Sequence, residues 1–115
     1  MSGQLSFIKE YETYCPQIKA YNDRNECMQI HVRFPIVMTD LSGSKKRIRY
    51  DMVEKTEGGA QVARARSEDR YGNQFEIVDV WRESKQGICI ERTVKAVKVE
   101  KGNRHTIDYG TMLPW

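Results

Sequence analysis

The sequence predicts an all-β fold, an antiparallel β-sandwich of about six or seven strands. Short runs of β-branched and aromatic residues alternate with polar residues, and turn clusters rich in Gly, Asn and Asp separate them at intervals of roughly 10 to 15 residues. No stretch keeps a helical period without interruption. The 115 residues suit one domain, residues 1–115, which is either complete or a fragment of a longer chain.

Composition excludes several classes of protein. The net charge is +3, with 19 basic and 16 acidic residues interleaved, which is not the excess typical of a nucleic-acid-binding domain. The longest uncharged apolar run, residues 34–38, is far shorter than the roughly 20 residues of a membrane-spanning helix, and the N-terminus lacks a signal peptide pattern. Three widely spaced cysteines indicate reduced thiols and a cytoplasmic protein, with a Cys15–Cys27 disulfide as the alternative.

The first half of the chain predicts three strands. In residues 1–27, Pro16 interrupts a helix-like apolar pattern and residues 11–15 have strand composition, which predicts one short strand and a loop. Residues 28–38 alternate strictly and predict a strand, in which Pro35 requires an edge position or a bulge. A loop at 39–44 precedes a third alternating strand at 46–53.

The second half is dominated by a hairpin. A turn at 57–59, a strand at 60–66 and a turn at 68–73 lead into it, and Gly72 is expected to take a positive φ. Strands at 74–82 and 88–99 then flank a polar link that ends in Gly87. A weaker strand at 105–113 follows.

The hairpin carries the most specific predictions. On its first strand Asp79 and Trp81 share a face, with Trp81 in the core and Arg92 opposite Asp79. The second strand adds a core row of Ile88, Ile90 and Val94. Apolar residues change face at 77–78 and at 96–97, which predicts bulges or positions covered on both faces.

The residues offer little chemistry. His31 and His105 are the only histidines, and no cysteine or histidine pair has metal-ligand spacing. Cys89 is expected to be a half-buried structural thiol, since nucleophilic catalysis would require Cys89 or Cys15 beside a histidine. We therefore predict no catalytic residue, no metal ligand and no cofactor.

Two clusters could still bind a ligand. Asp79 and Trp81 place a carboxylate beside an indole, as sugar-binding surfaces do, whereas a cross-strand pair of Asp79 with Arg92 or Lys95 is the structural interpretation. The basic stretch at 45–50, with Arg64 and Arg66, could follow a phosphate backbone. Basic residues also protect an exposed strand edge, and nucleic acid is the less favoured partner.

Residues 64–82 and 87–94 resemble a segment of the N-terminal β-sandwich of certain large bacterial glycoside hydrolases. The shared patterns are the D-x-W of residues 79–81 and the apolar–x–apolar–x–Arg–x–Val of residues 88–94, and they cover roughly 30 of 115 residues. The resemblance implies an accessory sandwich packed on a helical (α/α) toroid that holds the catalytic carboxylates. Asp79, Trp81 and Arg92 match the patterns with a structural role, and no catalytic residue carries over.

Two functional hypotheses follow. The first is a non-catalytic accessory domain of a carbohydrate-active enzyme, whose partner is a helical catalytic domain or a carbohydrate. The second is a stand-alone binding module for nucleic acid, a protein or an apolar ligand. In either case, exposed strand edges would permit homo-oligomers.

Overall fold

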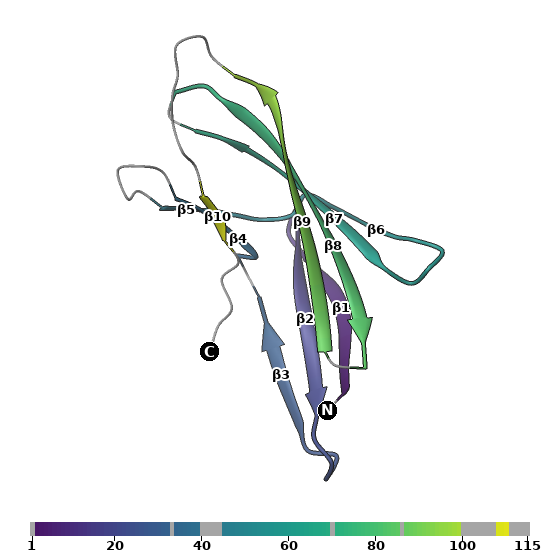
Figure 1. The fold of residues 1–115 in the computed structure, drawn as a ribbon. Helices are drawn as coiled ribbons and strands as arrows, with labels where there is room; N and C mark the ends of the chain where they lie inside the picture. The colour runs from purple at the N-terminus through teal and green to yellow at the C-terminus, as the bar shows by residue number, and fades with distance from the viewer. Residues whose placement is uncertain are drawn as a thin grey trace.

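A computed structural model describes residues 2–32, 34–39, 45–69, 71–85, 87–99 and 108–110. These residues form ten strands in three antiparallel sheets, and no helix occurs among them (Figure 1). None of them therefore belongs to a helix able to cross a membrane. The predicted all-β antiparallel class is confirmed, with more strands than the six or seven expected.

The first sheet consists of β1 (Ser2–Glu10), β2 (Thr13–Tyr21) and β3 (Cys27–His31), in that order. The prediction of one short strand and a loop in residues 1–27 was wrong, because β1 and β2 form a long hairpin there. Tyr11, in the connecting turn, has a φ of 56°, an unusual conformation for a residue other than glycine.

Pro16 lies inside β2 without breaking the β1–β2 ladder. Its carbonyl accepts a hydrogen bond from the Val32 amide on the β3 side of the strand. Since the N–H and C=O groups of one strand residue point to the same neighbour, the position of the missing Pro16 amide also faces that side. Proline therefore removes no hydrogen bond between β1 and β2.

The second sheet contains β4 (Ile36–Thr39) and β5 (Lys45–Ile48), with β10 (Asp108–Gly110) paired to β4. The strand predicted at 28–38 is divided, because the chain leaves the first sheet before Pro35 and enters the second after it. Of the strand predicted at 105–113, residues 105–107 and 111–113 lie outside the described residues.

The third sheet runs β6 (Met52–Lys55), β7 (Gln61–Glu68), β8 (Gln74–Ser84) and β9 (Gly87–Lys98). The strand predicted at 46–53 is therefore also divided, since β5 and β6 belong to different sheets. The turn at 57–59 is present as predicted. Of the turn predicted at 68–73, Glu68 is the last residue of β7, residues 71–72 form a turn in which Gly72 has a φ of 87°, and residue 70 lies outside the described residues.

The β8–β9 hairpin follows the predicted pairing, with Asp79 directly opposite Arg92. Its register shifts once, where Phe75 faces Ala96 and Gln74 faces Lys98, so that Val97 is the extra residue of a bulge. This confirms the irregularity predicted at 96–97. At 77–78 the ladder is continuous, and a half-buried Val78 follows a fully buried Ile77.

The sheets enclose one core, in which β1 packs against β8 and β9. Its buried residues come from the second and third sheets and the link between them: Ile36, Met38, Ile48, Tyr50, Ala63, Ala65, Ile77 and Trp81. The first sheet adds partly buried side chains, among them Phe7, Tyr14 and Ile18. Trp81 is thus core as predicted, and Ile88 and Ile90 pack against the core.

Two burial predictions on β9 were wrong. Val94 is 39% exposed, because the C-terminal half of β9 extends past the ends of β1 and β2 (Figure 1). Cys89 is exposed rather than half-buried. A Cys15–Cys27 disulfide is absent: Cys27 pairs with Tyr21 at the far end of β2, and six residues of strand separate cysteines by roughly 20 Å, beyond disulfide reach.

The β6–β7 turn gives a matched test of backbone conformation. Gly59 has a φ of 83°, whereas Gly58 does not have a positive φ, and a Cβ at either position would meet no atom within 4 Å. We expect Gly59→Ala to lower the free energy of unfolding by about 1 kcal/mol and Gly58→Ala to leave it nearly unchanged, as measured by urea denaturation. Equal losses in the two variants would contradict this assignment.

Candidate functional site

The three residues singled out in the sequence, Asp79, Trp81 and Arg92, lie together inside the sandwich. Asp79 and Trp81 are two residues apart on β8, so both side chains point into the core, and both are fully buried. Arg92 faces Asp79 from β9, and its side chain is 13% exposed. Asp79 and Trp81 are therefore out of contact with solvent.

The Asp79 carboxylate is fully hydrogen-bonded. Arg92 donates from Nε to Oδ1 and from Nη2 to Oδ2, both at 2.7 Å, and Tyr50 donates its hydroxyl proton to Oδ2. Arg92 Nη2 also donates to the carbonyl of Pro35 at 3.2 Å. A bidentate arginine and a phenol together satisfy a carboxylate that would otherwise be very costly to bury.

Tyr50 is the residue that sequence reasoning missed. It lies in the link between β5 and β6, is completely buried and forms an isolated bridge with Tyr14 of β2. Its hydroxyl donates to Asp79 and accepts a hydrogen bond from Trp81 Nε1 at 3.0 Å. The alternation at 46–53 placed it on an apolar face, but no local signal showed that the chain changes sheet there.

The surroundings fix the protonation of this cluster. Burial, followed by the charge of Asp79 and the hydrogen bond to it, raises the pKa of Tyr50 well above its ordinary value, so the phenol remains a donor. Desolvation opposes the charge on Arg92, but its hydrogen bonds and ion pair with Asp79 outweigh this and raise its pKa. Tyr50 and Arg92 therefore stay protonated at neutral pH.

An aromatic group packs over the polar cluster. Phe7 of β1 meets the Trp81 ring edge to face, with ring centroids 5.7 Å apart and planes at 88°, and meets Tyr50 at 6.1 Å. Tyr50 and Trp81 meet at 6.4 Å. Edge-to-face contacts of this kind are favourable, and they connect the first sheet to the Asp79 pair.

Glu76, Glu83 and Glu91, the other carboxylates of the β8–β9 hairpin, each contact a different partner. Glu76 pairs with Arg64 at 3.1 Å, Glu91 lies 3.5 Å from Arg82, and Glu83 accepts a hydrogen bond from the Leu5 amide. Glu76 and Glu91 thus each have an arginine partner of their own. These contacts show no joint site for acid–base chemistry among the three.

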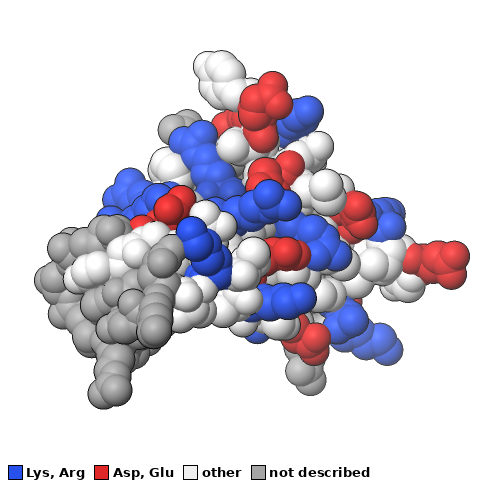
Figure 2. Space-filling view, turned by 90° about the horizontal axis from the view of Figure 1, so that it is seen from above, with Lys and Arg blue, Asp and Glu red and all other residues white. Residues whose placement is uncertain are grey.

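The basic side chains of the stretch at 45–50 contact an aromatic ring and a backbone carbonyl. Arg47 and Arg49 lie over the Phe34 ring, with guanidinium carbons 5.4 and 4.5 Å from its centroid, and Lys46 Nζ donates to the Glu68 carbonyl. Figure 2 shows basic and acidic side chains interleaved over one face of the molecule. This arrangement does not favour a phosphate-following surface.

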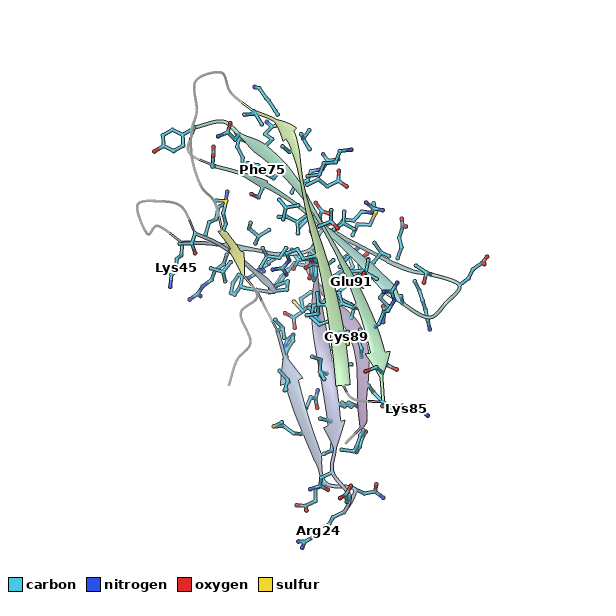
Figure 3. The ribbon with its side chains drawn as sticks, in the orientation of Figure 1. Arg24, Lys45, Phe75, Lys85, Cys89 and Glu91 are labelled. Atoms are coloured by element: carbon cyan, nitrogen blue, oxygen red, sulfur yellow. The ribbon has the colours of Figure 1, made fainter. Side chains whose placement is uncertain are left out.

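A pocket of about 520 Å³ lies between β5 and the upper ends of β7, β8 and β9. Figure 3 labels Phe75 at this end of the third sheet and Lys45 on β5. Most of the lining side chains are polar or charged: Lys46, Arg66, Ser67, Glu68, Gln74 and Glu76. Such a lining does not suit an apolar ligand.

A second cluster joins residues that are distant in the sequence. Glu10 of β1, Cys15 of β2 and His31 of β3 have ligand-type atoms within 4.8 Å of one another. No short sequence motif contains these three residues, because they are on three different strands and come together only when the first sheet pairs. Cys15 is 1% exposed, which disfavours the Cys/His nucleophile considered from the sequence.

Comparison with protein-family models, with curated proteins and with solved structures found no match.

The buried ion pair gives a matched test of stability. Arg92→Met leaves the Asp79 carboxylate buried without its bidentate partner, so we expect a loss of about 3 kcal/mol in the free energy of unfolding. The control is Arg82→Met, which removes an exposed pair with Glu91 and should cost less than about 1 kcal/mol. Urea denaturation of both variants measures this difference, and similar losses would show that the Asp79 network does not stabilise the fold.

The Tyr50 phenol predicts a stability loss in alkali. Because its pKa is raised in the folded state, its contribution is complete below the unfolded pKa of about 10 and declines as the pH rises above that value. Tyr50→Phe should reduce the slope of unfolding free energy against pH above about pH 10, by at most about 1.4 kcal/mol per pH unit. Tyr11→Phe removes a phenol that is 93% exposed and is the control. An unchanged slope in Tyr50→Phe would refute the assignment.

Proposed function

We propose that this chain is a non-catalytic accessory β-sandwich domain associated with a carbohydrate-active enzyme, a glycoside hydrolase. The observation that carries the proposal is the burial of Asp79 and Trp81, the two residues of the pattern that resembles the sandwich of those enzymes. Their contacts are made to Tyr50, Arg92 and Phe7. Their role in the proposed domain is to hold the scaffold together.

A surface for the partner domain is available on β9. Val94, Val97 and Val99 are 39%, 61% and 63% exposed, on the part of the chain that extends past the first sheet. Exposed apolar groups of this kind are typical of surfaces that another domain covers. We assign this strip to the helical catalytic domain that the resemblance implies, and we expect the catalytic carboxylates to lie in that domain.

Chemistry within the described residues supports the non-catalytic half of the proposal. The Asp79 cluster is closed to solvent, and Glu76 and Glu91 each have an arginine partner. The alternative, a stand-alone module for nucleic acid, a protein or an apolar ligand, has less support, because basic and acidic side chains are interleaved on the face seen in Figure 2 and most side chains that line the pocket are polar.

The natural form of the protein tests the proposal. An antibody raised against residues 1–115 would be used on extracts of the source cells, and the captured polypeptide would be sized and assayed on a panel of aryl glycosides. We expect a polypeptide much larger than 13.5 kDa that hydrolyses a glycoside, and no hydrolysis by residues 1–115 alone. A captured polypeptide of 13.5 kDa without glycosidase activity would favour the stand-alone module. Hydrolysis by residues 1–115 alone would refute the non-catalytic assignment.

A further inference from the structure

We propose that Glu10, Cys15 and His31 form a binding site for Zn²⁺ on the face of the first sheet opposite Phe7 and Ile18. The three side chains supply a carboxylate, a thiol and an imidazole, the ligand types that zinc takes in proteins. Their ligand atoms lie within 4.8 Å of one another. The site is separate from the Asp79 cluster and from the proposed partner surface.

The register of the sheet places the three side chains together. Cys15 pairs with Ile8, and Glu10 lies two residues further along β1, so both side chains of this diagonal pair are on one face. On the other side of β2, Gln17 pairs with His31, which makes His31 the second diagonal neighbour of Cys15. The core-facing residues Phe7 and Ile18 alternate with this set, so the cluster lies on the opposite face of the sheet, where Cys15 is also buried.

The distances are close to those of a coordinated ion. Tetrahedral Zn²⁺, with bonds of about 2.0 to 2.3 Å, separates its ligand atoms by roughly 3.3 to 3.6 Å. His31 Nε2 lies 3.5 Å from Glu10 Oε1, and Cys15 Sγ lies 3.9 Å from Glu10 Oε2. Small side-chain movements therefore suffice to close the set around one ion.

One buried polar atom of this cluster lacks a hydrogen bond. His31 Nε2 is buried and makes no hydrogen bond among the described residues, although Glu10 Oε1 lies 3.5 Å away, and buried polar atoms are rarely left without a hydrogen bond. The backbones that carry the ligands are fixed nearby, since Thr13 Oγ1 donates to the Glu10 carbonyl and the Val32 amide donates to the Pro16 carbonyl. A metal bond would satisfy the imidazole.

The ligand set selects the class of ion. A thiolate with an imidazole favours Zn²⁺ or a similar borderline ion over Mg²⁺ and Ca²⁺, which prefer oxygen ligands. Binding requires the Cys15 thiolate, so the thiol proton leaves to solvent as the S–Zn bond forms. The Cys15 side chain and His31 Nε2 are buried, whereas the Glu10 side chain is 41% exposed, so we expect the ion to enter beside the Glu10 carboxylate and to take water as its fourth ligand.

Cobalt serves as the probe, because Co²⁺ occupies zinc sites and a cobalt–thiolate bond gives a charge-transfer absorption band. The reference protein is the double variant Cys27→Ser/Cys89→Ser, which removes both exposed thiols. We expect this protein to bind one Co²⁺ with a charge-transfer band, to exchange it for Zn²⁺ and to unfold at a higher temperature with Zn²⁺ present. Adding Cys15→Ser should abolish the band.

Because Cys15 is buried, its substitution could prevent folding, so two further variants test the site at its other ligands. Glu10→Gln and His31→Gln change partly exposed side chains and should each weaken Zn²⁺ binding at least about ten-fold, as measured by competition with a chromophoric chelator, while circular dichroism shows a folded protein. Three outcomes would overturn the proposal: no cobalt band in the folded reference protein, a band that survives Cys15→Ser, or unchanged Zn²⁺ affinity in both further variants.

Discussion

The buried carboxylate of Asp79 is the constraint on which the rest of the fold depends. An isolated ion in a protein interior is very costly, so its partners must reach it from wherever the chain can supply them. Arg92 comes from the neighbouring strand, and Tyr50 comes from the link between two sheets. Arg92 in turn holds the carbonyl of Pro35, between β3 and β4. One ion pair thus connects the long β8–β9 hairpin to two of the places where the chain changes sheet.

This arrangement also fixes strand register. Shifting β8 by one residue against its neighbours would turn Asp79 and Trp81 to the outer face and bring half-buried residues such as Val80 inward. Arg92 would then lose the carboxylate while remaining largely buried. Phe7 adds a second restraint, because its ring packs on both Tyr50 and Trp81. The physical role of the D-x-W pattern in this sandwich is therefore to make an incorrect register of β8 energetically costly.

The sequence predicted what depends on local pattern. Period-two alternation identified β7, β8 and β9, and the pairing of Asp79 with Arg92 followed from the hairpin link at 83–87. Alternation does not report a change of sheet, so residues 28–38 and 46–53 read as single strands although each is divided. Pro16 led to the wrong prediction for residues 1–27. Proline is tolerated in β2 because its missing amide faces the β3 side, just beyond the end of β3, and this position is not visible in the sequence.

Site prediction failed for the same reason. Tyr50 is defined by contacts with residues about 30 positions away, and Glu10, Cys15 and His31 meet only after three strands pair. Neither group has a spacing that a motif search would recognise. The sequence did predict the pairing of Asp79 with Arg92 and the core position of Trp81. It did not predict that Asp79 is completely buried.

The order of the strands has a consequence for how quickly this protein can fold. Apart from the pairing of β10 with β4, every ladder in the described residues joins strands that follow one another in the chain. Such neighbours require the closure of short loops only, and hairpins of this kind form within microseconds. The contact of Tyr50 with Asp79 joins the link between β5 and β6 to β8, so we expect it to require both sheets. We expect the hairpins to form early, with the cross-strand pair of Asp79 and Arg92 among their contacts, and the contact of Tyr50 with this pair to form last, as the sandwich closes.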